Sequence, residues 1–216
     1  ILMIDKKQTN KLCLRWKGNQ RRIGITGGIA SGKTLIGNFL FESKQWPILD
    51  ADLYAHEALR PDSQISKKVL LRYGSQIIQK STKNHHIINR KALAEIVFKS
   101  NIEKNWLEQE IHPFVNKRIE EDLEKFKSHS VIILIIPLLF EQNYTNLCSE
   151  ILYVDCSRVK QIERLQARDK LSIDLANQKI NAQWTNSFKK QFADFIINNS
   201  QDDESWKEQL KKLNDF

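Results

Sequence analysis

The 216-residue chain is long enough for one domain with a sizeable core, or for one core with small inserted subdomains. Its 28% charged and 41% hydrophobic residues exclude an intrinsically disordered chain and favour a globular protein. The net charge of +8 fits an anionic small molecule or a nucleic acid as partner, or a basic surface that only aids solubility, because the basic residues are spread along the whole chain.

The cysteines and the apolar segments indicate the cellular compartment that we expect for this protein. Cys13, Cys148 and Cys156 show no metal-ligand spacing, and their odd number fits free thiols in a reducing environment. The longest apolar run, 131–140, is interrupted by Pro137 and is too short to cross a bilayer. No signal-peptide pattern opens the sequence. We therefore expect a cytoplasmic protein without membrane contact.

Residues 1–20 are basic and only weakly apolar. We expect them to form a poorly ordered extension, with a basic arm or an organellar presequence as alternatives. No function follows from them.

Five stretches are predicted as strands, and three of them are near-continuous runs of Ile, Leu and Val. They are residues 23–26, 47–50, 131–136, 151–155 and 195–198. Continuous apolar runs are typical of strands that are covered on both faces, as in a parallel sheet between helices.

Helical segments alternate with these strands. They are predicted at residues 33–43, 51–59, 101–126 and 158–170. In the long segment apolar residues recur at helical spacing, although Pro113 is expected to kink or break the helix. The order predicts an α/β fold with a five-stranded parallel sheet and helices on both faces. The insert from about 60 to 126 should form a separate helical lobe.

Residues 27–34, Gly-Gly-Ile-Ala-Ser-Gly-Lys-Thr, match the pattern GxxxxGK(S/T) between a predicted strand and a predicted helix. A polyphosphate needs several converging main-chain N–H groups, and glycine permits the wrapped backbone that brings them together. Lys33 should reach the β- and γ-phosphates, and the Thr34 hydroxyl should bind Mg²⁺. The following helix adds its N-terminal dipole. The sequence therefore predicts a core of the P-loop NTPase type.

The loop alone does not specify the reaction. Residues 116–119, Asn-Lys-Arg-Ile, lack the aspartate of an NKxD motif, and no DxxG occurs, which argues against a GTPase. A motor or helicase usually has an apolar strand ending in Asp-Glu, whereas strand 131–136 is followed by Pro137. A small-molecule kinase needs only the loop, a carboxylate, lid arginines and an acceptor pocket.

Carboxylates and arginines suited to a kinase are present. Asp50 and Asp52 stand at the carboxyl end of the second strand, where ligands of open α/β sheets bind, although Asp52 could be a helix N-cap. Arg164 and Arg168 share a helix face, which could be solvated or could stabilise the transferred phosphoryl group. His112, before the proline, could be a purely structural histidine.

Eight segments occur in an order that is more specific to one protein family than the glycine-rich loop alone. They are GITGGIASGKT, ILDADLYAHEAL, NRKALAEIVF, EIHPFV, IIPLLFE, RLQARD, INAQW and ADFIINNS. In these segments the chain resembles the dephospho-coenzyme A kinases over about residues 22–213. The resemblance implies transfer of the ATP γ-phosphoryl group to the ribose 3′-hydroxyl of dephospho-coenzyme A, the final step of coenzyme A biosynthesis.

The resemblance also implies a domain organisation. Residues 1–20 would be an extension, 60–126 the helical acceptor-substrate lobe and 158–191 the lid region. The nucleotide-binding core would consist of residues 21–59, 127–157 and 192–216.

Roles for individual residues follow by motif match. Asp52 would take or orient the acceptor proton, and Lys33, Arg164 and Arg168 would act on the transferred group. The implied ATP-binding residues are Gly28, Ala30, Ser31, Gly32, Lys33, Thr34, Leu35 and Asn199, the last near adenine. The implied acceptor-binding residues are Asp52, Arg90 and His112, and the implied Mg²⁺ ligand is Thr34, with Asp50 as a further candidate. The small-molecule acceptor would be the partner, with no nucleic acid, on a monomer or weak homo-oligomer.

Several positions depart from the family pattern. Leu35 stands where threonine is usual, Asn89 where aspartate is common, and Lys179 where arginine is frequent. Residues 183–190, QWTNSFKK, replace a more usual QMPLEEK, and no glycine follows the last strand at 200–201. The changes between 179 and 189 leave the detailed contacts of the lid open.

Three alternatives remain at this point. One is another P-loop kinase of a nucleoside or nucleotide. The second is a nucleic-acid-associated ATPase, which the basic charge would suit. The third is a regulatory protein with a vestigial kinase fold, against which the intact Lys33, Thr34 and Asp52 argue.

Overall fold

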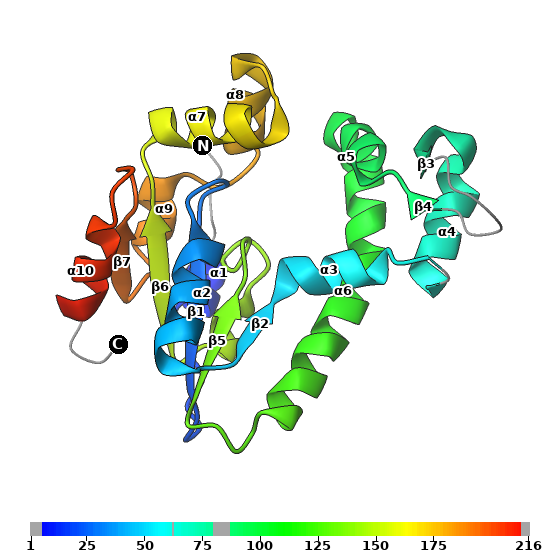
Figure 1. Cartoon of the computed structure of the whole chain (residues 1–216). Coiled ribbons are helices and arrows are strands. Elements are labelled where there is room, and N and C mark those ends of the chain that lie inside the picture. The colour runs from blue at the N-terminus through cyan, green and yellow to red at the C-terminus, as the bar shows by residue number, and fades with distance from the viewer. Residues whose placement is uncertain (1–5, 62, 80–86, 213–216) are drawn as a thin grey trace. The chain divides into compact units, whose positions relative to one another are not determined.

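The computed structural model describes residues 6–61, 63–79 and 87–212. The chain forms two compact units (Figure 1). The first combines Ile1–Asp50 with Phe126–Phe216, and the second is Ala51–Lys125.

The first unit is built on a parallel sheet of five strands. The strands, in their spatial order, are β2 (Ile48–Asp50), β5 (Val131–Ile135), β1 (Arg21–Gly27), β6 (Glu150–Asp155) and β7 (Phe195–Asn198). All five predicted strands are confirmed, and so is the predicted α/β fold. The insertion of the second unit between β2 and β5 explains why two adjacent strands are so far apart in the sequence.

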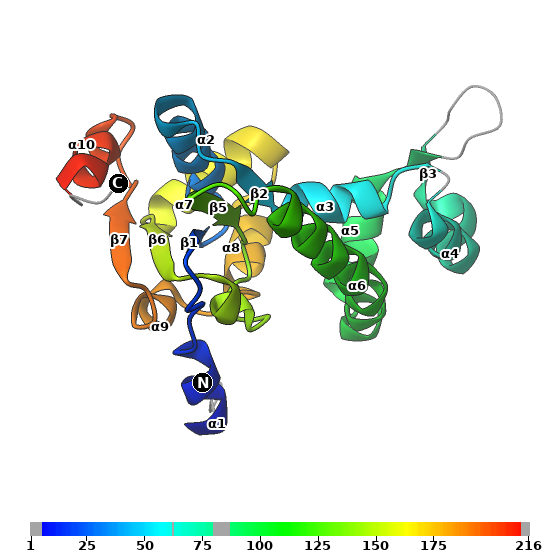
Figure 2. The same ribbon diagram turned by 90° about the horizontal axis from the view of Figure 1, so that it is seen from below.

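Helices cover both faces of this sheet (Figure 2). Helices α2 (Lys33–Lys44) and α10 (Ser205–Lys212) lie on one face, where the rings of Phe39 and Trp206 meet edge to face at 5.2 Å. Helix α9 (Asn186–Lys190) lies on the other face. The buried side chains of the central strands are almost all aliphatic, as a sheet covered on both sides requires.

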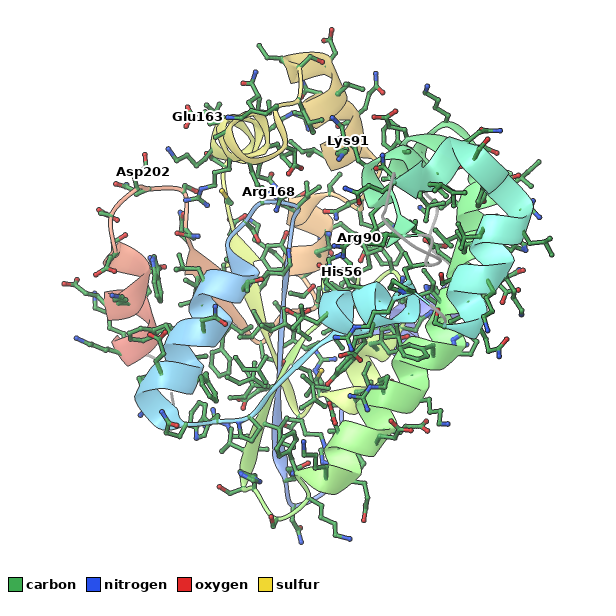
Figure 3. All side chains as sticks on the ribbon, turned by 45° about the vertical axis from the view of Figure 1, so that its right-hand side comes forward. His56, Arg90, Lys91, Glu163, Arg168 and Asp202 are labelled. Atoms are coloured by element: carbon green, nitrogen blue, oxygen red, sulfur yellow. The ribbon has the colours of Figure 1, made fainter. Side chains whose placement is uncertain are left out.

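The segment between β6 and β7 contains α7 (Arg158–Asp169) and α8 (Ile173–Asn181) before α9. Ser157 caps α7 by accepting a hydrogen bond from the Lys160 amide. The Lys160 ammonium pairs with Glu163 at 2.9 Å and with Asp202, in the turn after β7, at 2.5 Å. This pairing ties α7 to the β7–α10 connection (Figure 3).

The N-terminal extension contains a short helix, α1 (Lys6–Leu12). Leu12 is fully buried, and the Lys11 carbonyl accepts a hydrogen bond from the Thr145 hydroxyl at 3.1 Å. Thr145 belongs to a 3₁₀ turn, η2 (Tyr144–Leu147), between β5 and β6. The expectation of a poorly ordered extension is therefore wrong for this segment.

Contacts beyond α1 continue this attachment. Arg15 donates to the Phe192 carbonyl at 2.7 Å and pairs with Asp194 at 3.2 Å. The ring of Trp16 stacks against the Arg22 guanidinium, 3.6 Å from the ring centroid. Both contacts join Arg15 to residues more than a hundred positions away, so no local sequence pattern could predict them.

The second unit is mainly helical, as predicted for the insert. Its elements are α3 (Ala51–Ala58), α4 (Gln64–Tyr73), η1 (Gly74–Ile77), β3 (Ile78–Gln79), β4 (Ile87–Ile88), α5 (Arg90–Lys99) and α6 (Asn101–Lys125). The antiparallel pair β3–β4 was not predicted, because two-residue strands are too short to show a period.

A small apolar cluster and one carboxylate hold α4, α5 and α6 together. Val69, Ile77 and Leu93 are buried in the cluster. Glu103 accepts hydrogen bonds from Arg72 at 2.7 and 3.0 Å and from the Tyr73 hydroxyl at 2.7 Å. The bonds from Arg72, followed by the one from Tyr73, lower the pKa of Glu103 to about 2.

Helix α3 groups with the helical unit, although the sequence analysis placed it at the end of the core. The buried Tyr54 hydroxyl donates to Asp122 of α6 at 2.5 Å. Arg118 of α6 pairs with Glu57 at 3.3 Å. Burial, then the bond to Asp122, raises the pKa of Tyr54, so its phenol stays protonated.

Helix α6 runs continuously through Pro113. Of the two outcomes expected at Pro113, the break is therefore wrong, and the kink stays a prediction. Proline removes one main-chain hydrogen bond, and here the apolar residues Val115, Ile119 and Leu123 keep the helix buried along one side.

No helix in the ranges that the structure describes combines the length and the apolar character needed to cross a bilayer.

The attachment of the extension can be tested with two leucines. We expect Leu12→Ala to lower the free energy of unfolding by about 2–3 kcal/mol, because it leaves a cavity at a fully buried site. Leu14→Ala is the matched control, since Leu14 is 56% exposed and should change stability little. Chemical denaturation measures both, and equal effects of the two substitutions would contradict the packing described for α1.

Candidate active site

The glycine-rich loop joins β1 to α2, and its last glycine is the N-cap of α2. Gly32 has φ of +96°, a conformation that side chains strongly disfavour. A Cβ atom at this position would also lie 2.2 Å from Asn199 Nδ2. The first amides of α2 therefore open toward the loop, as an anion site at a helix N-terminus requires.

Lys33 lies over the loop. Its Nζ donates hydrogen bonds to the carbonyls of Gly27 at 3.2 Å and Gly28 at 2.9 Å. Thr34 follows in the first turn of α2 and is exposed. Ser31 is fully buried, and its Oγ has no hydrogen-bond partner among the described residues. An ammonium and a buried, unpaired hydroxyl at one loop suit an anionic oxygen ligand.

Of the two predicted arginines, Arg164 reaches the loop. Its Nη1 lies 3.5 Å from the carbonyl oxygens of both Ala30 and Ser31. Arg168, labelled on the same helix in Figure 3, donates to both carboxylate oxygens of Asp169 at 2.8 and 3.0 Å. Those bonds lower the pKa of Asp169 below its ordinary value. The guanidinium of Arg168 is thus held at the end of α7 by an ion pair.

Asn199 follows β7 and is buried against the same loop. Its Nδ2 donates to the Ser31 carbonyl at 2.7 Å, and its own amide donates to the Asp155 carbonyl at 2.8 Å. The structure therefore places Asn199 against the loop, and its expected position near the adenine stays a prediction.

The two predicted carboxylates occupy different units. Asp50 ends β2 and is only 9% exposed. Asp52 is exposed and lies inside the first turn of α3, which begins at Ala51, so it is not the N-cap. Its charge is favourable in the first turn of a helix.

The two predicted acceptor residues lie in the second unit. Arg90 is the exposed first residue of α5, and His112 is a half-buried residue of α6. Figure 3 also shows the exposed His56 on α3 and Lys91 beside Arg90. Asn89, which departs from the family pattern, caps α5 by accepting from the Ala92 amide at 3.1 Å, so it serves as aspartate would.

Two glutamines that the sequence analysis missed hold the loop directly. Gln161 of α7 donates to the Ile29 carbonyl at 2.7 Å, and Gln183, after α8, accepts from the Ile29 amide at 2.9 Å. Gln183 lies in the segment INAQW, which carries part of the family resemblance, but no role was assigned to it, and no motif marks Gln161. The only signal for Gln161 is its place on the buried side of α7.

A parallel sheet, a glycine loop that ends as the N-cap of a helix, and a lysine folded over that loop define a P-loop phosphate-binding protein. Comparison with known proteins gives the family. Residues 21–204 match the sequence profile described as dephospho-CoA kinase. The chain belongs to the dephospho-CoA kinase family, and it is a kinase of coenzyme A biosynthesis.

Curated relatives agree with this assignment. A dephospho-CoA kinase of Prochlorococcus marinus strain NATL2A is 74% identical over 214 residues, which cover 99% of this chain and 100% of the relative. A dephospho-CoA kinase from another strain of the same species, MIT 9313, is 45% identical over 199 residues, which cover 92% of this chain and 98% of the relative.

Solved structures are similar across most of the chain. The crystal structure of TT1252 from Thermus thermophilus has a TM-score of 0.73 at 27% identity, covering 92% of this chain and 98% of that one. The dephospho-CoA kinase from Campylobacter jejuni has a TM-score of 0.64 at 27% identity, covering 90% of this chain and 95% of that one.

The conformation of Gly32 leads to a prediction about nucleotide binding. We expect Gly32→Ala to raise the KM for ATP about tenfold or more, because the new methyl group strains the backbone and displaces Asn199. Gly74→Ala is the control for strain alone, since Gly74 also has a positive φ, +58°, but an added Cβ would have no atom within 4 Å. Steady-state kinetics would contradict the loop assignment if both variants kept the wild-type KM.

Proposed function

We propose that this chain transfers the ATP γ-phosphoryl group to the ribose 3′-hydroxyl of dephospho-coenzyme A with loop 27–34 as its ATP site and Asp52 as the carboxylate at the acceptor. The proposal is supported chiefly by one observation. The loop carries its lysine over a main-chain nest at the N-terminus of α2, in a chain that belongs to this family. Such a nest binds a polyphosphate through main-chain N–H groups.

Lys33 and the loop amides form the phosphate-binding part of the site. The two carbonyl contacts of Lys33 keep the ammonium beside the loop, where phosphate oxygens can replace them. Gly28, Ala30, Ser31, Gly32, Thr34 and Leu35 complete the proposed ATP-binding segment. Asn199, whose amide nitrogen holds the Ser31 carbonyl, is proposed to lie near the adenine.

The oxygen donors at this site fit Mg²⁺. Thr34 presents a hydroxyl in the first turn of α2, and Asp50 presents a carboxylate at the end of β2. A hard cation prefers such oxygens together with phosphate oxygens. Mg²⁺ bound there would neutralise charge on the β- and γ-phosphates.

The segment 158–191 is the proposed lid. Arg164 lies at the loop carbonyls, where its guanidinium can absorb the charge that develops on the transferred group. Arg168 can join it by leaving Asp169. A closed lid excludes water, which would otherwise accept the phosphoryl group.

The acceptor is proposed to bind the helical lobe, residues 60–126, through Arg90 and His112. Asp52 would accept a hydrogen bond from the 3′-hydroxyl and orient it for attack on the γ-phosphorus. Residues 21–59, 127–157 and 192–216 would form the nucleotide-binding core. We propose a cytoplasmic enzyme that acts as a monomer or weak homo-oligomer.

The reaction can be tested by mass spectrometry. We expect coenzyme A to form when the protein is incubated with ATP, Mg²⁺ and dephospho-coenzyme A, and turnover by Lys33→Ala to fall about 100-fold or more, because a preorganised charge is lost. Nucleoside monophosphates offered as acceptors should stay unmodified. Phosphorylation of those acceptors instead, or full activity of the variant, would contradict the proposal.

The role of Asp52 calls for a separate test. We expect Asp52→Asn to keep ATP affinity and to lower kcat by about 100-fold, because the acceptor hydroxyl loses a charged hydrogen-bond partner. Glu42→Gln is the matched control on an exposed carboxylate in the last turn of α2, outside the proposed site, and its kcat should stay near wild type. Nucleotide titration and initial rates measure the two quantities. Equal losses of affinity and rate in Asp52→Asn would exclude the orienting role.

A further inference from the structure

Both main-chain polar groups of Ile29, in the middle of the phosphate loop, are bonded to amide side chains. Gln161 Nε2 donates to the carbonyl at 2.7 Å, and Gln183 Oε1 accepts from the amide at 2.9 Å. We propose that Gln161 and Gln183 are positioning residues that fix the loop in its phosphate-binding shape and couple it to the segment between β6 and β7. The proposal rests on the assignment of loop 27–34 as the ATP site.

Gln161 is 1% exposed, and a chain of hydrogen bonds fixes which way its amide points. The Tyr153 hydroxyl donates to Asn186 Oδ1 at 2.8 Å, and Asn186 Nδ2 lies 3.5 Å from Gln161 Oε1. With its oxygen facing a donor, Gln161 must present its NH₂ group to the Ile29 carbonyl.

The close approach of these amides depends on a missing side chain. A Cβ atom at Gly28 would lie 2.4 Å from Gln161 Nε2 and 3.0 Å from Asn186 Oδ1. Gly28 has no positive φ, so the space that these amides occupy is the observed reason for a glycine at this position. The missing side chain lets the two amides pack against the loop.

Gln183 is held in place from the other side. The amide of the next residue, Trp184, donates to Glu141 Oε1 at 3.3 Å. The same carboxylate oxygen lies 3.0 Å from Nζ of Lys189, which is fully buried. The buried Lys189 ammonium has no hydrogen-bond partner among the described residues, so the nearby Glu141 carboxylate compensates its charge as an ion pair and attaches the 183–190 stretch to the chain after β5.

These bonds determine the directions of neighbouring amides. A peptide plane whose N–H or C=O is fixed cannot rotate freely, and the N–H groups that follow Ile29 are those proposed to bind phosphate. Preorganised donors bind an anion without first being ordered. Because Gln161 and Gln183 belong to the proposed lid segment, ATP affinity and the placement of that segment are linked, and the linkage is reciprocal.

The test compares Gln161→Met and Gln183→Met, which keep length but remove the hydrogen bonds. We expect each to raise the KM for ATP about fivefold, as the loss of one hydrogen bond predicts, with the KM for dephospho-coenzyme A unchanged. Asn177→Ala is the matched control, because Asn177 accepts from Arg158 within the same segment at 2.7 Å rather than from the loop. It should lower stability without changing the KM for ATP.

Amide hydrogen exchange of Ile29 without nucleotide gives a readout independent of activity. The amide should be protected in the wild type and in Asn177→Ala and should exchange faster in Gln183→Met, because that variant removes its acceptor. Unchanged protection in Gln183→Met would overturn the proposal. So would rises of both KM values together, or a KM for ATP that follows stability alone in all three variants.

Failure of this proposal differs from failure of the ATP-site assignment. If Lys33→Ala keeps wild-type ATP affinity and activity, the loop is not the ATP site and the proposal falls with it. If Lys33→Ala is impaired while both methionine variants keep the wild-type KM for ATP, the site stands and the positioning role is refuted.

Discussion

The main-chain N–H groups of a phosphate-binding loop are held in direction when carbonyl groups of the same loop are bonded to partners elsewhere. In this kinase those partners come from several elements. Lys33 donates hydrogen bonds to the carbonyls of Gly27 and Gly28. Gln161 donates to the carbonyl of Ile29, and Asn199 donates to that of Ser31. The parallel sheet makes this arrangement possible. Its neighbouring strands β1, β6 and β7 end at the same carboxyl edge, so the segments that follow them lie side by side.

The features predicted correctly from the sequence are those that a local residue pattern determines. All five predicted strands are present, three of them marked by near-continuous Ile, Leu and Val runs, and the glycine spacing predicted the loop and the lysine above it. Arg164 was selected from its helix face and Asn199 from the family resemblance, and both lie at the loop. The roles of Asp52, Arg90 and His112 stay predictions, because they depend on ligands and on how the two units are placed.

What sequence reasoning missed has physical causes. Gln161 and Gln183 act through single side-chain amides on main-chain atoms more than a hundred residues away, and such bonds leave no periodic trace. The extension looked unstructured because Leu12 finds its burial against distant parts of the chain. At Pro113 the helix continues despite the loss of one main-chain hydrogen bond, and its buried apolar side explains why the expected break does not occur.

The buried contact between Lys189 and Glu141 constrains how this sequence can evolve. Replacing either partner alone leaves the other charge buried without a counter-charge, which destabilises the fold. Replacing both with apolar groups of similar volume can be tolerated. These two positions should therefore change together or not at all among close homologues. Covariation of these two positions in an alignment would then show, without a structure, that the stretch after β5 contacts the chain that leads into β7.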